Sequence, residues 1–320
     1  MHDFVTTLDY PTRPEWARRV RSLTPDAPSA PTRLRRILSA AGEGKPILLD
    51  GFSRVDTLAA ALLARSRRKA PVVMTDCTWK TGGTRADRVL TRLGVRALDG
   101  PRTTFCVSST AERRIFPELW GVPADRVRIC RWYHGLTEAQ LAAPTSEDGP
   151  VFSGGRSLRD YEPLIRCAPG LGREIRIAAN REDLPDGVAV PANVVVGPTS
   201  HDEYLELMRS ACVVVVALER REDRSAGQTT YLNSMAMGKL TIVTETLGVS
   251  DHIEDRVTGL IVPAHDPDAL GDAIRWSVDP VNAAEVAAIR ARGRDVARTR
   301  FGPDRHIETL LEIADEAATR

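Results

Sequence analysis

Residues 235–270 read MAMGKLTIVTETLGVSDHIEDRVTGLIVPAHDPDAL, and this stretch decides the fold. A segment that ends at Gly238 leads into an apolar, β-branched run over 240–244. A second apolar run over 259–262 precedes Asp266-Pro267, a typical helix start. The order predicts helix, strand, turn, strand and helix, as in a parallel sheet covered by helices.

The same alternation extends over most of the 320 residues. Apolar runs predict strands over 46–50, 71–75, 103–107, 126–130, 151–153, 174–179, 193–196 and 212–217. Amphipathic segments predict helices over 55–67, 85–93, 109–120, 161–167, 201–210, 228–237 and 268–278. Strands that are apolar throughout are typical of sheets buried on both faces. The chain is therefore predicted to be an α/β protein with parallel sheets.

A polar segment divides the chain. Residues 142–150 read AAPTSEDGP, which is rich in turn formers and predicts a linker. We expect one domain over 1–143, a second over 150–300, and a helix over 303–320, with its return to the first domain as one option. Five prolines interrupt the first 35 residues, where the pattern supports one short helix, over 15–22.

The composition is that of an ordinary globular protein, with 42% hydrophobic and 27% charged residues. The longest apolar run, 212–218, is too short to cross a bilayer, and no signal peptide is visible. Five cysteines lack metal-type spacing, which predicts reduced thiols in a cytoplasmic protein. No metal-site or nucleic-acid pattern stands out.

Charge is distributed unevenly between the two halves. Residues 1–150 hold 24 Lys and Arg against 16 Asp and Glu, a balance of +8, whereas the remainder holds 20 against 27. One interpretation is an anionic acceptor, or a peripheral position on the inner face of a membrane. The other is that the two halves attract each other or that the charges are simply solvated.

The first motif with chemical content begins at 151–153 and continues Gly154-Gly155-Arg156, with Arg159 three residues further on. Glycines let backbone N–H groups approach an anion, and arginine binds phosphate through two nitrogens. The motif is typical of a diphosphate site at the carboxyl edge of a sheet. A tight turn with surface arginines remains the alternative.

The second motif follows the 212–217 strand. Its N–H groups at Gly227, Gln228, Thr229 and Thr230 would open a helix and form an anion site. Asn233 lies one turn further on, where it could reach a ribose. An ordinary helix start is the alternative.

The order of these motifs resembles the second domain of family 4 glycosyltransferases of the GT-B fold. The resemblance is carried by Met235-Ala-Met-Gly238, by 255–263 (DRVTGLIVP) and by Asp266-Pro-Asp-Ala-Leu270, with the Gly154-Gly155-Arg156 turn opening the same domain. It covers residues 150–300 well and the first half more weakly. It implies two Rossmann-like domains facing a cleft.

The sequence departs from the family pattern at two positions. The family carries two glutamates eight residues apart, and the matching positions here are Ser225 and Asn233. The family's lysine after the glycine turn is also missing, and Arg159 is the nearest cation. These departures leave the base and the sugar of the donor open.

The resemblance implies transfer of a sugar from a nucleotide-diphosphate sugar, with retention of configuration and without an essential metal or other cofactor. The implied donor-binding residues are Gly154, Gly155, Gly197, Ser225, Gly227, Gln228, Thr229, Thr230 and Asn233. The candidate catalytic residues are Arg156, Arg159 and Asp76, which ends a strand. The candidate acceptor-binding residues are Trp79, Lys80, Tyr133 and His134.

The acceptor itself is open among a small molecule, a glycan and a lipid. Two alternatives to this function stand beside it. One is a degenerate homologue that binds a nucleotide or a partner without transferring sugar, and the other is a membrane-surface enzyme that glycosylates a lipid.

Overall fold

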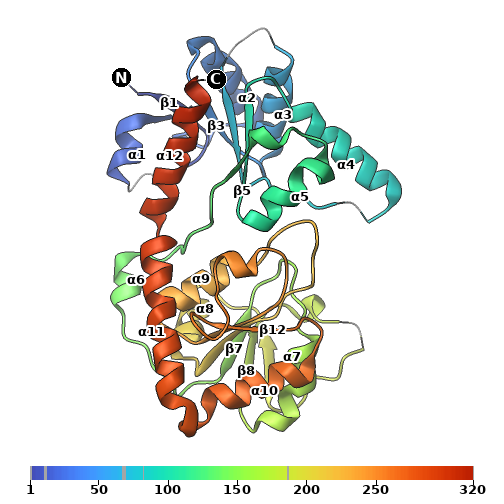
Figure 1. Ribbon diagram of the computed structural model, residues 1–320, viewed down its shortest axis with the longest axis vertical. Helices are drawn as coiled ribbons and strands as arrows, with labels where there is room; N and C mark the ends of the chain where they lie inside the picture. The colour runs from blue at the N-terminus through green and yellow to red at the C-terminus, as the bar shows by residue number, and fades with distance from the viewer. Residues whose placement is uncertain (1, 11–12, 67–69, 82, 186, 320) are drawn as a thin grey trace. The chain divides into compact units, whose positions relative to one another are not determined.

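Figure 1 shows the computed structural model, which describes residues 2–10, 13–66, 70–81, 83–185 and 187–319. The chain forms two compact units. Unit 1 comprises Met1–Arg131 together with Asp304–Arg320, and unit 2 comprises Trp132–Pro303. The division follows Arg131, ahead of the linker expected at 142–150.

Unit 1 is built on a six-stranded parallel sheet in the order β2-β1-β3-β4-β5-β6. The strands are β1 (Phe4–Thr6), β2 (Val20–Ser22), β3 (Ile47–Asp50), β4 (Val72–Thr75), β5 (Thr103–Val107) and β6 (Val127–Ile129). The last four match the predicted strands within a residue. The helix expected over 15–22 is wrong at its end, because residues 20–22 pair with β1 instead.

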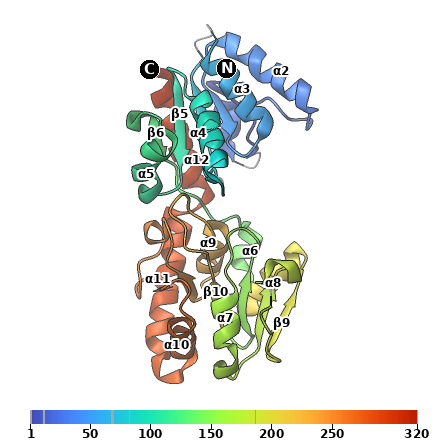
Figure 2. The ribbon, with the colours of Figure 1, turned by 90° about the vertical axis from the view of Figure 1, so that its right-hand side faces the viewer.

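Helices cover both faces of this sheet (Figures 1 and 2). One face packs on α2 (Ala30–Ala40), α3 (Arg54–Ala64), α4 (Arg85–Leu98) and α5 (Thr110–Trp120). The other packs on α1 (Pro14–Arg19) and α12 (Pro303–Thr319), whose Ile307 and Leu310 meet Leu48 and Val73 of the sheet. The end of the chain therefore completes the core of unit 1.

Unit 2 has a second six-stranded parallel sheet, in the order β12-β11-β10-β7-β8-β9. Its strands are β7 (Val151–Gly154), β8 (Ile175–Ala178), β9 (Val194–Gly197), β10 (Val213–Val216), β11 (Thr241–Thr244) and β12 (Leu260–Val262). All six were predicted. Val213–Val216 lies near the centre of the sheet and is fully buried, as its four valines indicate.

The helices of unit 2 are α6 (Glu138–Ala142), α7 (Glu162–Cys167), α8 (His201–Ser210), α9 (Gln228–Ala236), α10 (Pro267–Val278) and α11 (Ala283–Arg300). Residues of α8, α9 and α11 pack on one face of the sheet, and residues of α7, α10 and α11 join the core on the other. Helix α9 ends where Gly238 takes a φ of 77°, as expected for a glycine that terminates a helix.

Short 3-10 turns join these elements at 41–43, 124–126, 168–171, 181–183, 249–251 and 280–282. The predicted α/β class with two Rossmann-like domains is confirmed, since each unit has a parallel sheet with helices on both faces. None of the helices in the described ranges has both the length and the apolar character needed to cross a bilayer.

Candidate functional site

The sheet of unit 2 changes direction between β7 and β10. The chain leaves β7 toward β8 and β9 on one side, then returns to β10, which pairs with the other edge of β7. In open parallel sheets, ligands bind at such a switch point, outside the carboxyl ends of the strands. The first two motifs meet there, because one follows β7 and the other follows β10.

Two glycines shape the turn after β7. A Cβ on Gly154 would lie 2.5 Å from the ring of Tyr204, so a side chain does not fit there. Gly155 has a φ of 115°, and a Cβ on it would lie 2.5 Å from a nitrogen of Arg159. Gly154 therefore makes room for the Tyr204 ring, and Gly155 lets the Arg159 guanidinium lie directly against the backbone of the turn.

All three nitrogens of Arg159 donate hydrogen bonds to the protein. Nε donates to the carbonyl of Gly154 at 3.0 Å, Nη1 to that of Ser157 at 2.8 Å, and Nη2 to Oγ1 of Thr230 at 2.9 Å. Burial lowers the pKa of this guanidinium. Within the described part of the chain no carboxylate forms an ion pair with it. Arg159 is thus a positioned cation that links the β7 turn to the first turn of α9.

The N-terminus of α9 supplies the second feature. Gly227 takes the N-cap position with a φ of 78°, where a Cβ would press on Leu218 at 3.0 Å, and no side chain caps the helix. Thr229 accepts a 2.8 Å hydrogen bond from Nε1 of Trp132. The positive end of the helix dipole and the Arg159 guanidinium therefore lie together.

Two further arginines lie near this turn. Arg156 is exposed, as expected for a group that would meet a ligand. Arg224 was not predicted: it is buried, and its Nη2 lies 3.3 Å from Oγ of Ser157. In the sequence, Arg224 is only one of several charged residues in a loop over 219–224. Its proximity to Ser157 depends on the pairing of β10 with β7, which local sequence does not show.

Asn233 and Ser225 are both buried. Oδ1 of Asn233 accepts a 2.8 Å hydrogen bond from the backbone N–H of Gly135, which leaves the Nδ2 group as the one to meet a ribose. Gly197 ends β9, two strands away from β7 in the sheet. The donor-binding roles of these residues stay predictions.

In unit 1, Asp76 follows β4 and adopts a left-handed φ of 50°. Burial raises the pKa of this carboxyl to about 7, and the nearby charge of Asp50 adds to the effect. A carboxyl that changes its protonation near neutral pH is suited to take or give a proton. Asp76 therefore remains the acid–base candidate of unit 1.

The four predicted acceptor residues are divided between the units. In unit 1, Trp79 donates from Nε1 to the carbonyl of Gly51 at 2.9 Å and packs among Phe105, Phe116 and Trp120, while Lys80 is exposed. In unit 2, the ring centroids of Tyr133 and Trp132 lie 5.5 Å apart. His134 is buried, and its backbone N–H donates a hydrogen bond to the carbonyl of Phe301. Their role toward an acceptor stays a prediction.

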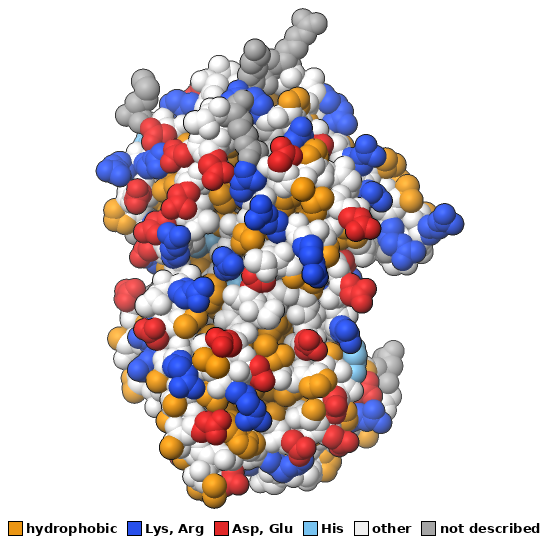
Figure 3. All heavy atoms as spheres, viewed as in Figure 1, with side chains coloured by type: hydrophobic (Ala, Val, Ile, Leu, Met, Phe, Trp, Pro, Cys, Tyr) orange, Lys and Arg blue, Asp and Glu red, His pale blue; other side chains and the backbone are white. Residues whose placement is uncertain are grey.

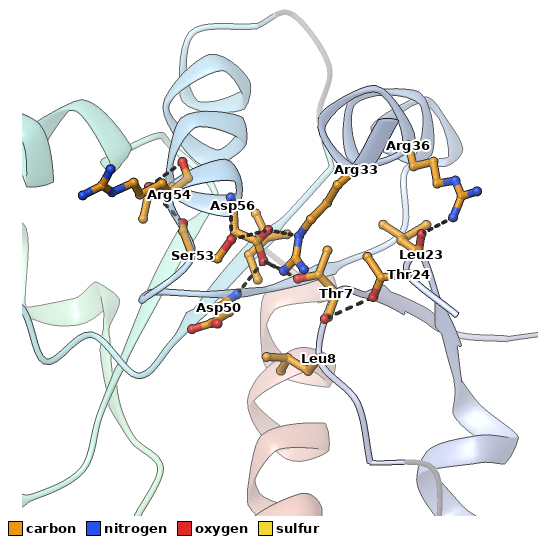
Figure 4. Close-up of polar contacts among 12 residues, drawn as sticks. Thr7, Leu8, Leu23, Thr24, Arg33, Arg36, Asp50, Ser53, Arg54 and Asp56 are labelled. Atoms are coloured by element: carbon orange, nitrogen blue, oxygen red, sulfur yellow. Dashed lines mark hydrogen bonds and ion pairs between the residues drawn. The ribbon is translucent and has the colours of Figure 1, made fainter. Parts of the chain in front are cut away.

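The sheet of unit 1 has its own switch point, between β1 and β3, and internal contacts fill it (Figure 4). The fully buried Asp56 accepts hydrogen bonds from Nε and Nη2 of Arg33 at 2.6 and 2.8 Å, and from the N–H of Asp50 at 3.0 Å. The hydroxyls of Thr7 and Ser53 also donate to it. Asp56 raises the pKa of Arg33.

Known proteins resemble this chain in sequence and in fold. Residues 168–279 match the family model described as glycosyl transferases group 1. A D-inositol 3-phosphate glycosyltransferase from Saccharomonospora viridis is 27% identical over 255 residues, which cover 72% of this chain. The match spans only 56% of that relative's length.

Solved glycosyltransferases share the fold over nearly the whole chain. HepE from Anabaena, solved with UDP-glucose, is 12% identical with a TM-score of 0.68, and the match covers 99% of this chain and 92% of that one. A glycosyltransferase from Rickettsia africae is 13% identical with a TM-score of 0.65, covering 98% and 89%. At these identities the likeness shows the fold.

The sheet topology, the motif order and these matches agree. This chain has the two-domain fold of the GT-B glycosyltransferases, and it resembles the group 1 (family 4) glycosyltransferases most clearly in unit 2.

Proposed function

We propose that this protein transfers a sugar from a nucleotide-diphosphate sugar to an acceptor hydroxyl, and that unit 2 binds the donor. One observation carries the proposal: Arg159 is a partly buried cation without an acidic partner in the described residues, fixed at the switch point beside the N-terminus of α9. A cation that is partly withdrawn from water is stabilised by a counter-charge, and a diphosphate supplies one.

The proposed chemistry is electrostatic stabilisation of the leaving group. The bond between the anomeric carbon and the phosphate oxygen breaks, and the electron pair leaves with the diphosphate. Arg156, Arg159 and the N–H groups of Gly227–Thr230 would stabilise the developing negative charge. The acceptor hydroxyl bonds to the anomeric carbon and releases its proton, for which Asp76 is the candidate base. Retention of configuration and independence of metal ions follow from the family resemblance and belong to the proposal.

The related proteins suggest the first molecules to test. HepE has been solved with UDP and with UDP-glucose, which favours UDP as the first donor fragment. The curated relative is named for an inositol phosphate, and the balance of +8 over residues 1–150 favours an anionic acceptor of that kind. Inositol phosphates are therefore the first acceptors to offer.

Calorimetry of UDP and of uridine tests the donor site. Arg156→Ala should weaken UDP binding about 10-fold, as expected for a lost charged hydrogen bond, and leave uridine binding unchanged. Arg300→Ala, which removes an exposed arginine at the end of α11, is the matched control. Equal losses for UDP and uridine would exclude a phosphate role.

The proposal includes independence of metal ions. Transfer activity should therefore persist in EDTA.

A second candidate is a homologue that binds a nucleotide without transferring sugar. It is favoured by the two positions where the family carries glutamates, since Ser225 and Asn233 lack carboxylates and Asn233 already binds Gly135. Tight UDP binding combined with no transfer from any UDP-sugar to any of the offered acceptors would favour this candidate.

A further inference from the structure

The exposed apolar side chains of unit 1 gather on two neighbouring helices. Eight large hydrophobic residues are strongly exposed in the described part of the chain, and six of them lie on or next to α3 and α4. These six are Phe52, Leu58, Leu62, Val89, Leu90 and Leu93. Helices α3 and α4 contact each other, so the apolar residues belong to one region of the surface.

Helix α4 has two apolar faces. Val95 and Leu98 are buried and join the core of unit 1. Val89, Leu90 and Leu93 recur at intervals of three and four residues on the opposite side, and each is more than half exposed. The inner pair explains why the helix continues past Gly94 to Leu98, beyond the predicted end at 93. The outer row, Val89, Leu90 and Leu93, belongs to neither hydrophobic core of unit 1 in the described residues.

Arginines follow the same helix. Arg85, Arg88, Arg92 and Arg96 recur at intervals of three or four and lie along one flank of the outer row. In the described ranges none of the four forms an ion pair. The helix has one acidic residue, Asp87, whose carboxylate bonds Thr84 in the helix cap. Figure 3 shows hydrophobic and Lys or Arg side chains side by side over α4.

We propose that this outer face of α4, together with Leu58 and Leu62 of α3, docks on an anionic phospholipid membrane. An exposed apolar row flanked by arginines is the pattern of a helix that lies in the plane of a bilayer interface, with apolar side chains among the acyl chains and cations among the headgroup phosphates. The inference rests on unit 1 alone and does not depend on the proposed transferase activity.

Charge favours a membrane over a second copy of this chain. Two α4 faces packed together would bring eight arginines into one interface, with the two Asp87 carboxylates already engaged in helix caps. Such an arrangement opposes association, whereas an anionic surface neutralises every one of these cations.

Vesicle co-sedimentation tests the proposal with the full chain. We expect binding to vesicles of equal parts phosphatidylcholine and phosphatidylglycerol, weak binding to pure phosphatidylcholine, and a decrease as salt rises. Leu90→Glu with Leu93→Glu should reduce binding more than 10-fold, because two apolar anchors become anions. Arg88→Gln with Arg92→Gln should weaken binding to the anionic vesicles by about 5-fold for each arginine.

The matched control is Val281→Glu, which changes a valine of unit 2 that is 87% exposed. It should bind vesicles like the wild type. The α4 variants should keep the wild-type melting temperature and UDP affinity, which separates this proposal from that of the donor site. No binding of the wild type to the anionic vesicles, or undiminished binding of the Leu90/Leu93 variant, would overturn it. So would a concentration-dependent dimer in light scattering that the same variant abolishes, since a second copy would then cover this face.

Discussion

The two sheets have switch points of the same kind, and the chain uses them differently. In unit 1 the switch point at the carboxyl ends of β1 and β3 is filled by Asp56. Its carboxylate accepts hydrogen bonds from Arg33 and from hydroxyl and backbone donors. In unit 2 the corresponding place holds Arg159 without a carboxylate partner in the described residues. The two switch points share their topology but differ in charge balance, and this difference is the reason we propose the donor site in unit 2.

The largest loss of stability is expected in unit 1, where the charge of Arg33 is already balanced by Asp56. Asp56→Ala leaves Arg33 partly buried without its counter-ion, so the free energy of unfolding should fall by about 3–5 kcal/mol. Urea denaturation measures it. Asp26→Ala is the control, because this carboxylate pairs with Arg36 at the surface, where water screens the pair and its loss should change stability much less. Similar losses in the two variants would show that the Asp56 network is not the anchor of unit 1.

Asp76 gives a pH-dependent effect in the same unit. Its folded-state pKa of about 7 lies above the usual aspartate pKa of 3.8, so between these values the folded state holds a proton that the unfolded state releases. Wild-type stability should therefore decrease as pH rises from about 4 to 7. Asp76→Asn should remove this loss and be more stable by up to about 4 kcal/mol above pH 7.

Stability measured against pH for Asp76→Asn checks the sign of this effect. Asp9→Asn, a change at an exposed carboxyl of unit 1, is the control and should follow the wild type. A stability difference that does not vary with pH would mean that Asp76 is ionised throughout, and the acid–base assignment would lose its support.

His306 of α12 titrates in the opposite sense. Burial lowers its pKa to about 4, and its Nδ1 lies 2.8 Å from the carbonyl of Arg131. As pH falls below about 6.5, the unfolded state takes up a proton first. The free energy of unfolding of unit 1 should therefore fall by about 3 kcal/mol by pH 4. His306→Gln should flatten this acid limb. An unchanged acid limb in urea denaturation would show that His306 does not control it.

The sequence predicted the elements that have a long apolar or amphipathic pattern and not those that lack one. Ten of the twelve strands were predicted, because long apolar runs identify strands that are buried on both faces. The strands β1 and β2 were missed, since three-residue segments among prolines carry no periodic pattern. Helix α2 was not predicted for a similar reason, because it begins among the prolines of the first 35 residues, although Pro31 in its first turn is compatible with a helix start.

The candidate site divides in the same way. Gly154, Gly155, Arg159 and the start of α9 could be found from local motifs, because a tight turn and a helix N-terminus have their own residue preferences. Arg224 and the contact between Asn233 and Gly135 could not, because each joins segments that are distant along the chain. Local spacing does not contain that information.

The smallest predicted effect concerns the ribose. If Nδ2 of Asn233 binds a ribose hydroxyl, Asn233→Ala should raise the dissociation constant of UDP about 3- to 10-fold, the equivalent of one neutral hydrogen bond. Calorimetry with UDP and 2′-deoxy-UDP measures the contact. A variant that still distinguishes the two nucleotides as strongly as the wild type would exclude Asn233 as the ribose ligand.

Hydrogen exchange with and without a nucleoside diphosphate shows which unit binds the donor. The ligand is chosen from UDP, GDP, ADP, TDP and CDP as the one that raises the melting temperature most. We expect slower exchange at 154–159 and 225–233 of unit 2, with exchange at 47–56 of unit 1 unchanged. Protection centred on 47–56, or no stabilisation by any of the five, would contradict the assignment of the donor site to unit 2.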